Sequence, residues 1–297
     1  MSTPVSEKKP LRARILALLP KDKRLRILTI AAAVLLVLTL LLHPHGTKTY
    51  LVLGMDNYGS LNETGRSDVM MLVSIDFTRT DVTAITFTRD LLVKPEGQSE
   101  KKLNAVVRAS GEEALCELME STFGVPIDGW FRVNFTTVIE LVDAIGGARV
   151  DLTAEEAKYV TRQVGEYPDH PLAEGMCHLN GAQALAYARC RQLDNDMGRG
   201  ERQNKLIAAM VQSTKRMTAA NIASVFSAMK HAWRSSLSGG EQLALLGKAI
   251  WLRGADVRSI GVPFEGTWGY GTAKSGASGV KADLEENRRL LMEALGL

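Results

Sequence analysis

Residues 69–87 read VMMLVSIDFTRTDVTAITF, in which two apolar runs flank the polar link Thr78–Asp81. Runs of β-branched and other apolar residues on either side of such a link are typical of two antiparallel strands. A third apolar run, Tyr50–Gly54, comes before them. We predict core strands at 50–54, 69–75 and 82–87, the last two as a hairpin. If the first and third strands run in the same direction and the second in the opposite direction, the residues after 54, before 69 and after 87 meet at one edge of the sheet.

The rest of the chain mixes strand and helix patterns. Apolar residues recur at helical spacing in 112–123 and 137–145, and longer helices are expected near 202–217, 220–233, 240–253 and 283–295. Short apolar runs predict strands at 130–135, 148–152 and 257–262, whereas the Gly- and Ser-rich stretch 266–279 is expected to be a mobile loop. We predict an α/β fold with a mixed central sheet covered by helices on both faces, because a hairpin is incompatible with a purely parallel sheet.

One segment is apolar enough to enter a membrane. Residues 27–42 read ILTIAAAVLLVLTLLL and contain no charge, and at about 1.5 Å per residue they span roughly 24 Å. Four Lys or Arg residues between 21 and 26 precede the segment, so the positive-inside rule places the N-terminus in the cytoplasm. We expect a cytoplasmic tail at 1–26, a transmembrane helix at 27–43 and one extracellular domain at 44–297. The alternative, a cleaved signal peptide, also leaves the domain outside the cell.

Charge and cysteine content exclude some classes of protein. The net charge of +3 comes from residues 1–26, which hold eight Lys or Arg and two acidic residues. The remainder is mildly acidic, which argues against a nucleic-acid partner. Cys116, Cys177 and Cys190 allow at most one disulfide and have no zinc-ligand spacing. The commonest nucleotide-binding and hydrolase motifs, the P-loop, GxSxG and HExxH, do not occur.

A first cluster of charged residues falls at the predicted edge of the sheet, where binding loops usually collect. Asp56 follows the first strand, Asp68 precedes the second, and Arg89 with Asp90 follows the third. Arg66 and Ser67 belong to the same cluster. The alternative interpretation is a set of weak surface ion pairs.

A second cluster lies between residues 189 and 203. An extended backbone would direct Arg189 and Arg191 to one face, and Arg199 and Gln203 would share a helix face. Guanidinium groups that point the same way repel one another unless an anion lies between them. Arginine binds phosphate oxygens in bidentate geometry, so the expected ligand is a phosphate or pyrophosphate. The full cluster is Arg189, Arg191, Asp194, Asp196, Arg199, Arg202 and Gln203.

The carboxylates of the first cluster require a cation if a pyrophosphate binds beside them. Unit charges about 4 Å apart interact by roughly 4 kcal/mol at an effective dielectric constant near 20, so each close carboxylate opposes the anion by that amount. Mg²⁺ binds through one or two carboxylates together with phosphate oxygens. We therefore predict a magnesium ion at Asp56 and Asp68.

Seven short segments, in this order, give the sequence a specific resemblance to the LytR-CpsA-Psr family of bacterial cell-wall glycopolymer ligases. They extend over about 150 residues behind the expected membrane anchor. The segments are LGMD at 53–56, GRSD at 65–68, TRD at 88–90, LVDAIGG at 141–147, LNG at 179–181, ALAYARCR at 184–191, and DMGR at 196–199 with Arg202 and Gln203.

This resemblance implies a phosphotransferase that attaches a polyprenyl-pyrophosphate-linked glycopolymer, such as teichoic acid or capsular polysaccharide, to peptidoglycan. The lipid tail would lie in an apolar tunnel between sheet and helices, with the head group at a mouth lined by Arg and Asp. A hydroxyl group of peptidoglycan would attack the sugar-side phosphorus, and polyprenyl phosphate would leave.

By motif, Asp56 and Asp68 resemble the magnesium-associated carboxylates of the family. Asp90 is the candidate base on position alone, and it could equally orient its neighbour Arg89. Thr88 and Ala148 replace the family's usual Pro and Val, and neither change removes a charge. The residues that resemble the pyrophosphate clamp are Arg66, Arg89, Arg189, Arg191 and Arg199, with Gln203 beside them, and Arg202 is also expected to bind the pyrophosphate.

Two other functions fit the same residues. A regulatory protein would bind a polyprenyl phosphate without turnover, and a hydrolase would transfer the phosphoryl group to water.

Overall fold

The computed structural model describes residues 45–55, 67–165, 171–190, 193, 196–217, 224–225, 233–249, 252, 255–274 and 276–297. The chain divides into two units, 1–44 and 45–297, and every described residue belongs to the second. The expected cytoplasmic tail and transmembrane helix therefore lie outside the described residues. None of the described helices is both long and apolar enough to cross a membrane.

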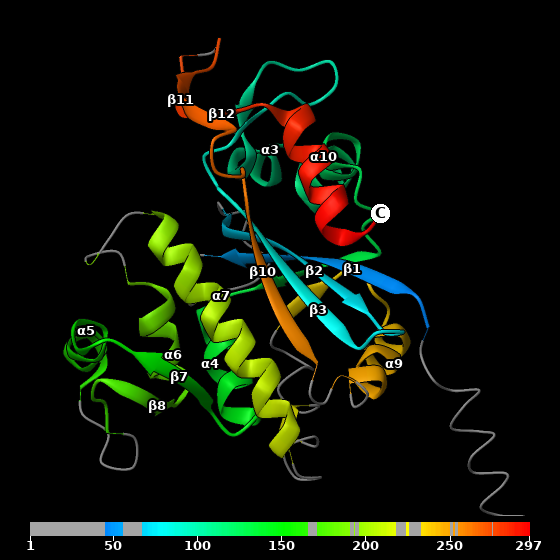
Figure 1. Cartoon of the computed structure of the whole chain (residues 1–297). Helices are drawn as coiled ribbons and strands as arrows, with labels where there is room; N and C mark the ends of the chain where they lie inside the picture. Colours follow the sequence, from blue (N-terminus) through cyan, green and yellow to red (C-terminus); the bar gives the residue numbers. More distant parts are fainter. Residues whose placement is uncertain are drawn as a thin grey trace, which may run out of the picture. The chain divides into compact units, whose positions relative to one another are not determined.

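A mixed sheet forms the centre of the second unit (Figure 1). Its described strands are β1 (Thr47–Met55), β2 (Ser67–Asp76), β3 (Asp81–Phe87), β6 (Gly129–Val133), β9 (Trp233–Ser235) and β10 (Asp256–Val262). They lie in the order β10-β3-β2-β1-β6-β9. β2 is antiparallel to both β1 and β3, which confirms the predicted hairpin, whereas β6 runs parallel to β1 and β10 parallel to β3.

The pairing brings three strand ends together. Gly54 near the end of β1 pairs with Val69, and Met70 pairs with Phe87 at the end of β3. The end of β1, the start of β2 and the end of β3 therefore lie at the same edge of the sheet, as the sequence predicts.

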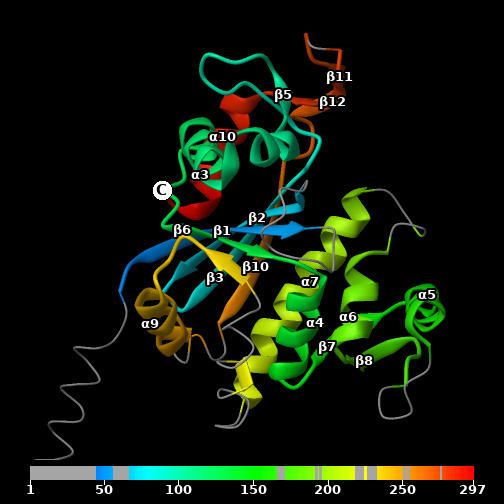
Figure 2. The same ribbon diagram turned by 180° about the vertical axis from the view of Figure 1, so that it is seen from behind.

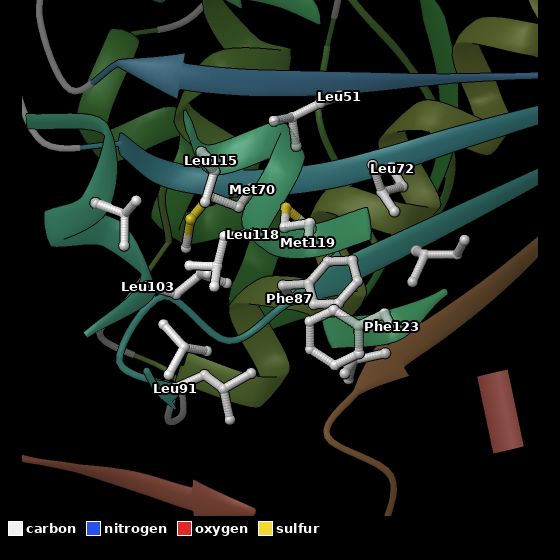
Figure 3. Close-up of a cluster of buried hydrophobic side chains, with 14 of the residues drawn as sticks. Leu51, Met70, Leu72, Phe87, Leu91, Leu103, Leu115, Leu118, Met119 and Phe123 are labelled. Atoms are coloured by element: carbon white, nitrogen blue, oxygen red, sulfur yellow. The ribbon is translucent and has the colours of Figure 1, made fainter. Parts of the chain in front are cut away.

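One face of the sheet packs into a solid apolar core. Leu51 and Leu53 of β1 and Met70 of β2 are fully buried there. Helices α3 (Leu103–Phe123) and α10 (Leu284–Leu295) cover this face in both views (Figures 1 and 2). Figure 3 shows the ring of Phe87 against that of Phe123, with the ring centroids 4.8 Å apart.

Helix α3 begins nine residues before the start expected at 112. The positive φ of 89° at Gly111 interrupts the helical backbone, and this kink hides the first two turns from a periodicity analysis. The C-terminal end at Phe123 agrees with the prediction, because Gly124 caps the helix in the left-handed conformation.

Three helices cover the opposite face of the sheet in both views (Figures 1 and 2). They are α4 (Phe135–Ala144), α6 (Gly181–Ala188) and α7 (Asp196–Ser213). Helix α5 (Ala154–Val164) and the ribbon of β7 (Ala148–Leu152) and β8 (Gly175–Leu179) pack beside them. Capping boxes at Asn134, Thr153 and Asn180 start α4, α5 and α6. The predicted strand at 148–152 is thus correct, but it pairs with β8 outside the central sheet.

The predicted loop at 266–279 is wrong. β11 (Trp268–Thr272) and β12 (Ser278–Ala282) form an antiparallel hairpin there. Glycines at 269, 271 and 279 interrupt the alternation of side chains that marks a strand, so the sequence resembles a loop. The remaining described elements are β4 (Leu92–Val93), β5 (Lys101–Lys102), the 3₁₀ turn Thr214–Arg216 and α9 (Gly239–Ala249).

The expected helix at 220–233 does not reach its predicted end, because Trp233 opens strand β9. Residues 224–225 are helical, and the rest of that segment lies outside the described residues.

Candidate functional site

A cavity of about 560 Å³ lies between the sheet and the helices α4, α6 and α7. The sheet contributes side chains that alternate with those of the solid core: Val52 alternates with Leu51 and Leu53, and Met71 and Val73 alternate with Met70 and Leu72. Alternate residues of a strand point to opposite faces. The sheet is therefore apolar on both faces, with a packed core on one and a cavity on the other.

The cavity is elongated. Along α7 its wall includes Arg199, Gln203, Leu206, Ile207 and Met210, which share one helix face. Arg199 and Met210 are eleven positions apart, which is a rise of about 16 Å at 1.5 Å per residue. The polar members occupy the N-terminal end of this wall and the apolar members the rest, so the cavity changes from polar to apolar along its length.

Most of the remaining wall is apolar. Val138, Ile139 and Leu141 of α4 and Leu185 of α6 face the cavity. Tyr159 of α5 also lines it, and burial raises the pKa of its phenol above the usual value, so its hydroxyl is neutral near pH 7. A volume of this size and an apolar wall with a few polar groups are typical of small-molecule sites.

Arg189 lies at the cavity, but not in the extended segment that the sequence predicts. It forms the C-cap of α6, and its guanidinium carbon lies 4.0 Å from the centroid of the Phe135 ring. A cation over an aromatic face is stabilised by the ring quadrupole, and the C-terminal end of a helix also favours a cation. The Phe135 ring and the C-terminal end of α6 therefore both stabilise the guanidinium group of Arg189 at this position.

Arg199 and Gln203 come from the first two turns of α7, as expected from their spacing. Arg199 is only 7% exposed and lines the cavity. The Gln203 side-chain amide donates a hydrogen bond of 3.4 Å to the carbonyl oxygen of Ala188, next to Arg189. The polar end of the cavity thus joins residues from the end of α6 and the start of α7.

A direct contact links this polar end to the sheet edge. Thr86 Oγ1 lies 2.7 Å from Asn204 Oδ1, and Asn204 follows Gln203 in α7. Thr86 is three residues before Arg89. The two arginine-bearing stretches, distant in sequence, are therefore packed together.

Arg89 and Asp90 occupy the turn after β3. Arg89 Nε is 4.0 Å from Asp90 Oδ1, and Lys102 Nζ is 3.3 Å from the same oxygen. Asp90 is thus an ion-pair partner of two cations. Sequence reasoning missed Lys102, which lies in a polar stretch with no recognisable motif.

Arg202 does not line the cavity, although the sequence places it in the anion clamp. It is 4% exposed, donates a 2.8 Å hydrogen bond from Nη2 to the Cys190 carbonyl oxygen, and pairs with Glu156 at 3.7 Å. Glu156 also caps α5. Arg202 therefore stabilises the backbone of the segment that follows α6, through its hydrogen bond to Cys190.

The rest of the predicted site lies outside the described residues: Asp56, Arg66, Arg191 and Asp194, together with the side chains of Asp68 and Asp196. The backbone at 68 is informative, because Gly54 pairs with Val69 whereas Met55 pairs with Ser67. Asp68 is therefore the extra residue of a β-bulge, a feature that often re-aims a side chain beside an active site.

The predicted magnesium site depends on the carboxylates of Asp56 and Asp68. In the part of the chain that it describes, no three His, Cys, Asp or Glu side chains are grouped so as to hold a metal ion. Both predicted ligand side chains, those of Asp56 and Asp68, fall outside that part. All three cysteines are free, and burial raises the pKa of Cys116 to about 12.

A buried ion pair near the same sheet edge was also missed. Arg132 of β6, beside Leu53 in the sheet, pairs with Glu112 just after the kink of α3. Both residues are at most 9% exposed. Trp130 Nε1 donates a 3.1 Å hydrogen bond to Glu113. The only sequence signal was an arginine inside the otherwise apolar run 130–133.

Comparisons with known proteins agree with this architecture. The sequence model of the LytR_cpsA_psr family matches residues 24–288. The polyisoprenyl-teichoic acid–peptidoglycan teichoic acid transferase TagV of Bacillus subtilis strain 168 is 30% identical over 180 residues, which are 59% of this chain and 45% of TagV. TagU of Bacillus cereus is 30% identical over 167 residues, or 54% and 51% of the two chains. The chain thus spans about half the length of these curated relatives.

Solved structures share the fold. TagT bound to LIIa-WTA superposes with a TM-score of 0.68 at 23% identity, covering 84% of this chain and 91% of that one. The crystal structure of B. subtilis TagV gives a TM-score of 0.63 at 25% identity, covering 85% and 98%. The predicted mixed sheet with helices on both faces is therefore confirmed.

Proposed function

The chain belongs to the LytR_cpsA_psr family, and on that premise we propose that it is a phosphotransferase that joins a polyprenyl-pyrophosphate-linked glycopolymer to peptidoglycan. The observation that carries the proposal is the cavity, which is apolar along most of its length and bears Arg189, Arg199 and Gln203 at one end. A lipid with an anionic head has this same division of polarity. The names of TagV and TagU support teichoic acid as the class of polymer.

The donor binds with its prenyl chain against the apolar residues of the sheet, α4 and α7. Its pyrophosphate lies at the polar end, where its oxygens accept bidentate hydrogen bonds from Arg189 and Arg199 and a further hydrogen bond from Gln203. Arg66, Arg89 and Arg191 complete this clamp in our proposal.

The reaction exchanges one phosphorus–oxygen bond for another. A peptidoglycan hydroxyl oxygen attacks the sugar-side phosphorus and loses its proton, and the bond from that phosphorus to the bridging oxygen breaks. Polyprenyl phosphate leaves, and the polymer is joined through a phosphodiester. Arginines stabilise the charge on the departing group, because phosphoryl transfer depends mainly on positioning and on electrostatics.

Asp90 could take the proton from the hydroxyl or orient Arg89. Its contacts with Arg89 and Lys102 favour the orienting role, because both cations already engage the carboxylate as ion-pair partners.

The magnesium site at Asp56 and Asp68 is part of the proposal. Carboxylate oxygens are the donors that Mg²⁺ prefers, and the residue after β1 and the bulge residue of β2 come from adjacent strand ends. When bound, the ion would neutralise part of the pyrophosphate charge. We also propose that residues 27–43 anchor the domain at the outer face of the cell membrane.

A transfer assay tests the function. The full chain is incubated with a synthetic polyprenyl-pyrophosphate-linked glycan and peptidoglycan, with and without Mg²⁺, and products are identified by mass spectrometry. Polymer covalently joined to peptidoglycan, with release of polyprenyl phosphate, is expected. Soluble polymer phosphate would instead indicate a hydrolase, and tight donor binding without any product would indicate a regulatory lipid-binding protein.

A further inference from the structure

The turn Thr88–Leu91, which carries Arg89 and Asp90, is held by backbone hydrogen bonds from three distant segments. Thr88 N–H donates to the Val262 carbonyl oxygen of β10 at 2.9 Å. The carbonyl oxygens of Arg89 and Leu91 accept from the first amides of α3, at 3.1 Å and 2.8 Å. The position of the turn is therefore set by elements that contribute no side chain to the cavity.

The third segment is β12 of the β11–β12 hairpin. Val280 N–H donates to the Asp90 carbonyl oxygen at 2.9 Å, and Val280 forms a parallel bridge with Leu91. Val280 is 7% exposed, whereas Tyr270 of β11 is 87% exposed. The hairpin thus contacts the turn through β12, whereas Tyr270 of β11 lies in solvent and Trp268 packs against the core.

Gly279 allows this close approach. A Cβ atom at 279 would lie 2.5 Å from the Asp90 carbonyl oxygen and 2.8 Å from Leu92 Cδ2. The oxygen belongs to the backbone, so relief of the contact requires Asp90 or β12 to move by close to an ångström. Gly269 of β11, by contrast, has open space at the same position.

We propose that Gly279 and Val280 form a positioning device that fixes Arg89 and Asp90 against the donor pyrophosphate. The same turn sets the 3.3 Å contact of Asp90 with Lys102, because Lys102 directly precedes the amides of α3 that hold the turn. The inference rests on the proposed transferase function, and it assigns a role in that function to a hairpin remote in sequence from the arginine clusters.

The test compares Gly279→Ala with Gly269→Ala in the full chain. Gly279→Ala is expected to lower kcat for transfer by about 100-fold, the scale of an ångström misplacement, and to raise donor KM, because Arg89 belongs to the pyrophosphate clamp. Binding of polyprenyl phosphate, which depends mainly on the apolar cavity, is expected to change little. Gly269→Ala is expected to match the wild type. Equal kcat values for the two variants would overturn the inference. A wild type without transfer activity would instead overturn the proposed function.

Hydrogen exchange tests the device without an activity assay. In Gly279→Ala the amides of Val280 and Asn104 are expected to exchange at least about tenfold faster than in Gly269→Ala, because opening of the turn becomes easier. Unchanged exchange would overturn the inference. If Gly279→Ala does not fold, hydrogen exchange is measured in the wild type instead. A Val280 amide that exchanges as fast as that of the exposed Lys274 would show that its hydrogen bond to Asp90 does not hold the turn, and would overturn the inference.

Discussion

Thr86 Oγ1 and Asn204 Oδ1 lie 2.7 Å apart in a hydrogen bond that joins the strand leading to Arg89 with the helix carrying Arg199 and Gln203. Asn204 is half-buried and its amide oxygen is the acceptor. The contact fixes one arginine-bearing stretch relative to the other, so its loss is predicted to affect both stability and donor binding.

Asn204→Ala is expected to lower the free energy of unfolding by about 1 kcal/mol, the usual net value of such a hydrogen bond. Thr86→Val should cost a similar amount, and the double variant little more than either, because both changes remove the same interaction. Denaturant unfolding of the three variants measures the coupling. Additive losses would mean that the two side chains act independently.

Phe135→Leu is expected to weaken polyprenyl pyrophosphate binding about two- to fivefold, which corresponds to the 0.5–1 kcal/mol of a partly exposed cation–π contact. The ring face that holds the Arg189 guanidinium is lost, whereas Phe135→Tyr keeps it and serves as the matched control. Equilibrium titration with the lipid gives both dissociation constants. Equal weakening in the two variants would contradict this role for the ring.

Ile207→Trp is expected to reduce polyprenyl phosphate binding more than about tenfold, because a large side chain there occupies space that the lipid needs. Binding of inorganic pyrophosphate, which has no tail, should change little. Leu243→Trp on α9 is the control, since Leu243 is 55% exposed and does not line the cavity. A parallel loss of pyrophosphate binding would show that the site itself is damaged.

Glu112→Gln is expected to destabilise the protein by about 3–5 kcal/mol, because it leaves the buried Arg132 guanidinium without its carboxylate. The double variant Arg132→Met with Glu112→Leu should recover much of that loss, since neither charge then remains. Thermal and denaturant unfolding report both effects. A double variant as unstable as Glu112→Gln would show that packing, not charge, dominates.

The sequence predicts elements whose pattern is local. The hairpin at 69–87 consists of two apolar runs around a polar link, and Gly146 and Gly147 follow the end of a helix where expected. The hairpin at 268–282 is different, because its strands are stabilised by contact with Asp90 and Leu91 and not by their own side-chain pattern. Gly279 is needed there because β12 comes close to the Asp90 carbonyl oxygen, but in the sequence a glycine is typical of a loop.

Local sequence patterns also fail to show which arginines of the candidate site reach the cavity. Arg199 and Arg202 look equivalent in the sequence, yet a helix turns about 100° per residue, and only the face with Arg199 and Gln203 meets the cavity. Arg202 points to Glu156 and the Cys190 carbonyl oxygen. Which face of α7 meets the sheet depends on the β7–β8 ribbon, and no local pattern in the helix reveals that choice.

The sheet is solid on one side and hollow on the other, so under the proposed function folding and lipid binding are thermodynamically linked. A ligand that enters the hollow supplies apolar packing that the polypeptide itself lacks, and at a hundredfold excess over Kd it adds about 2.7 kcal/mol to the free energy of unfolding.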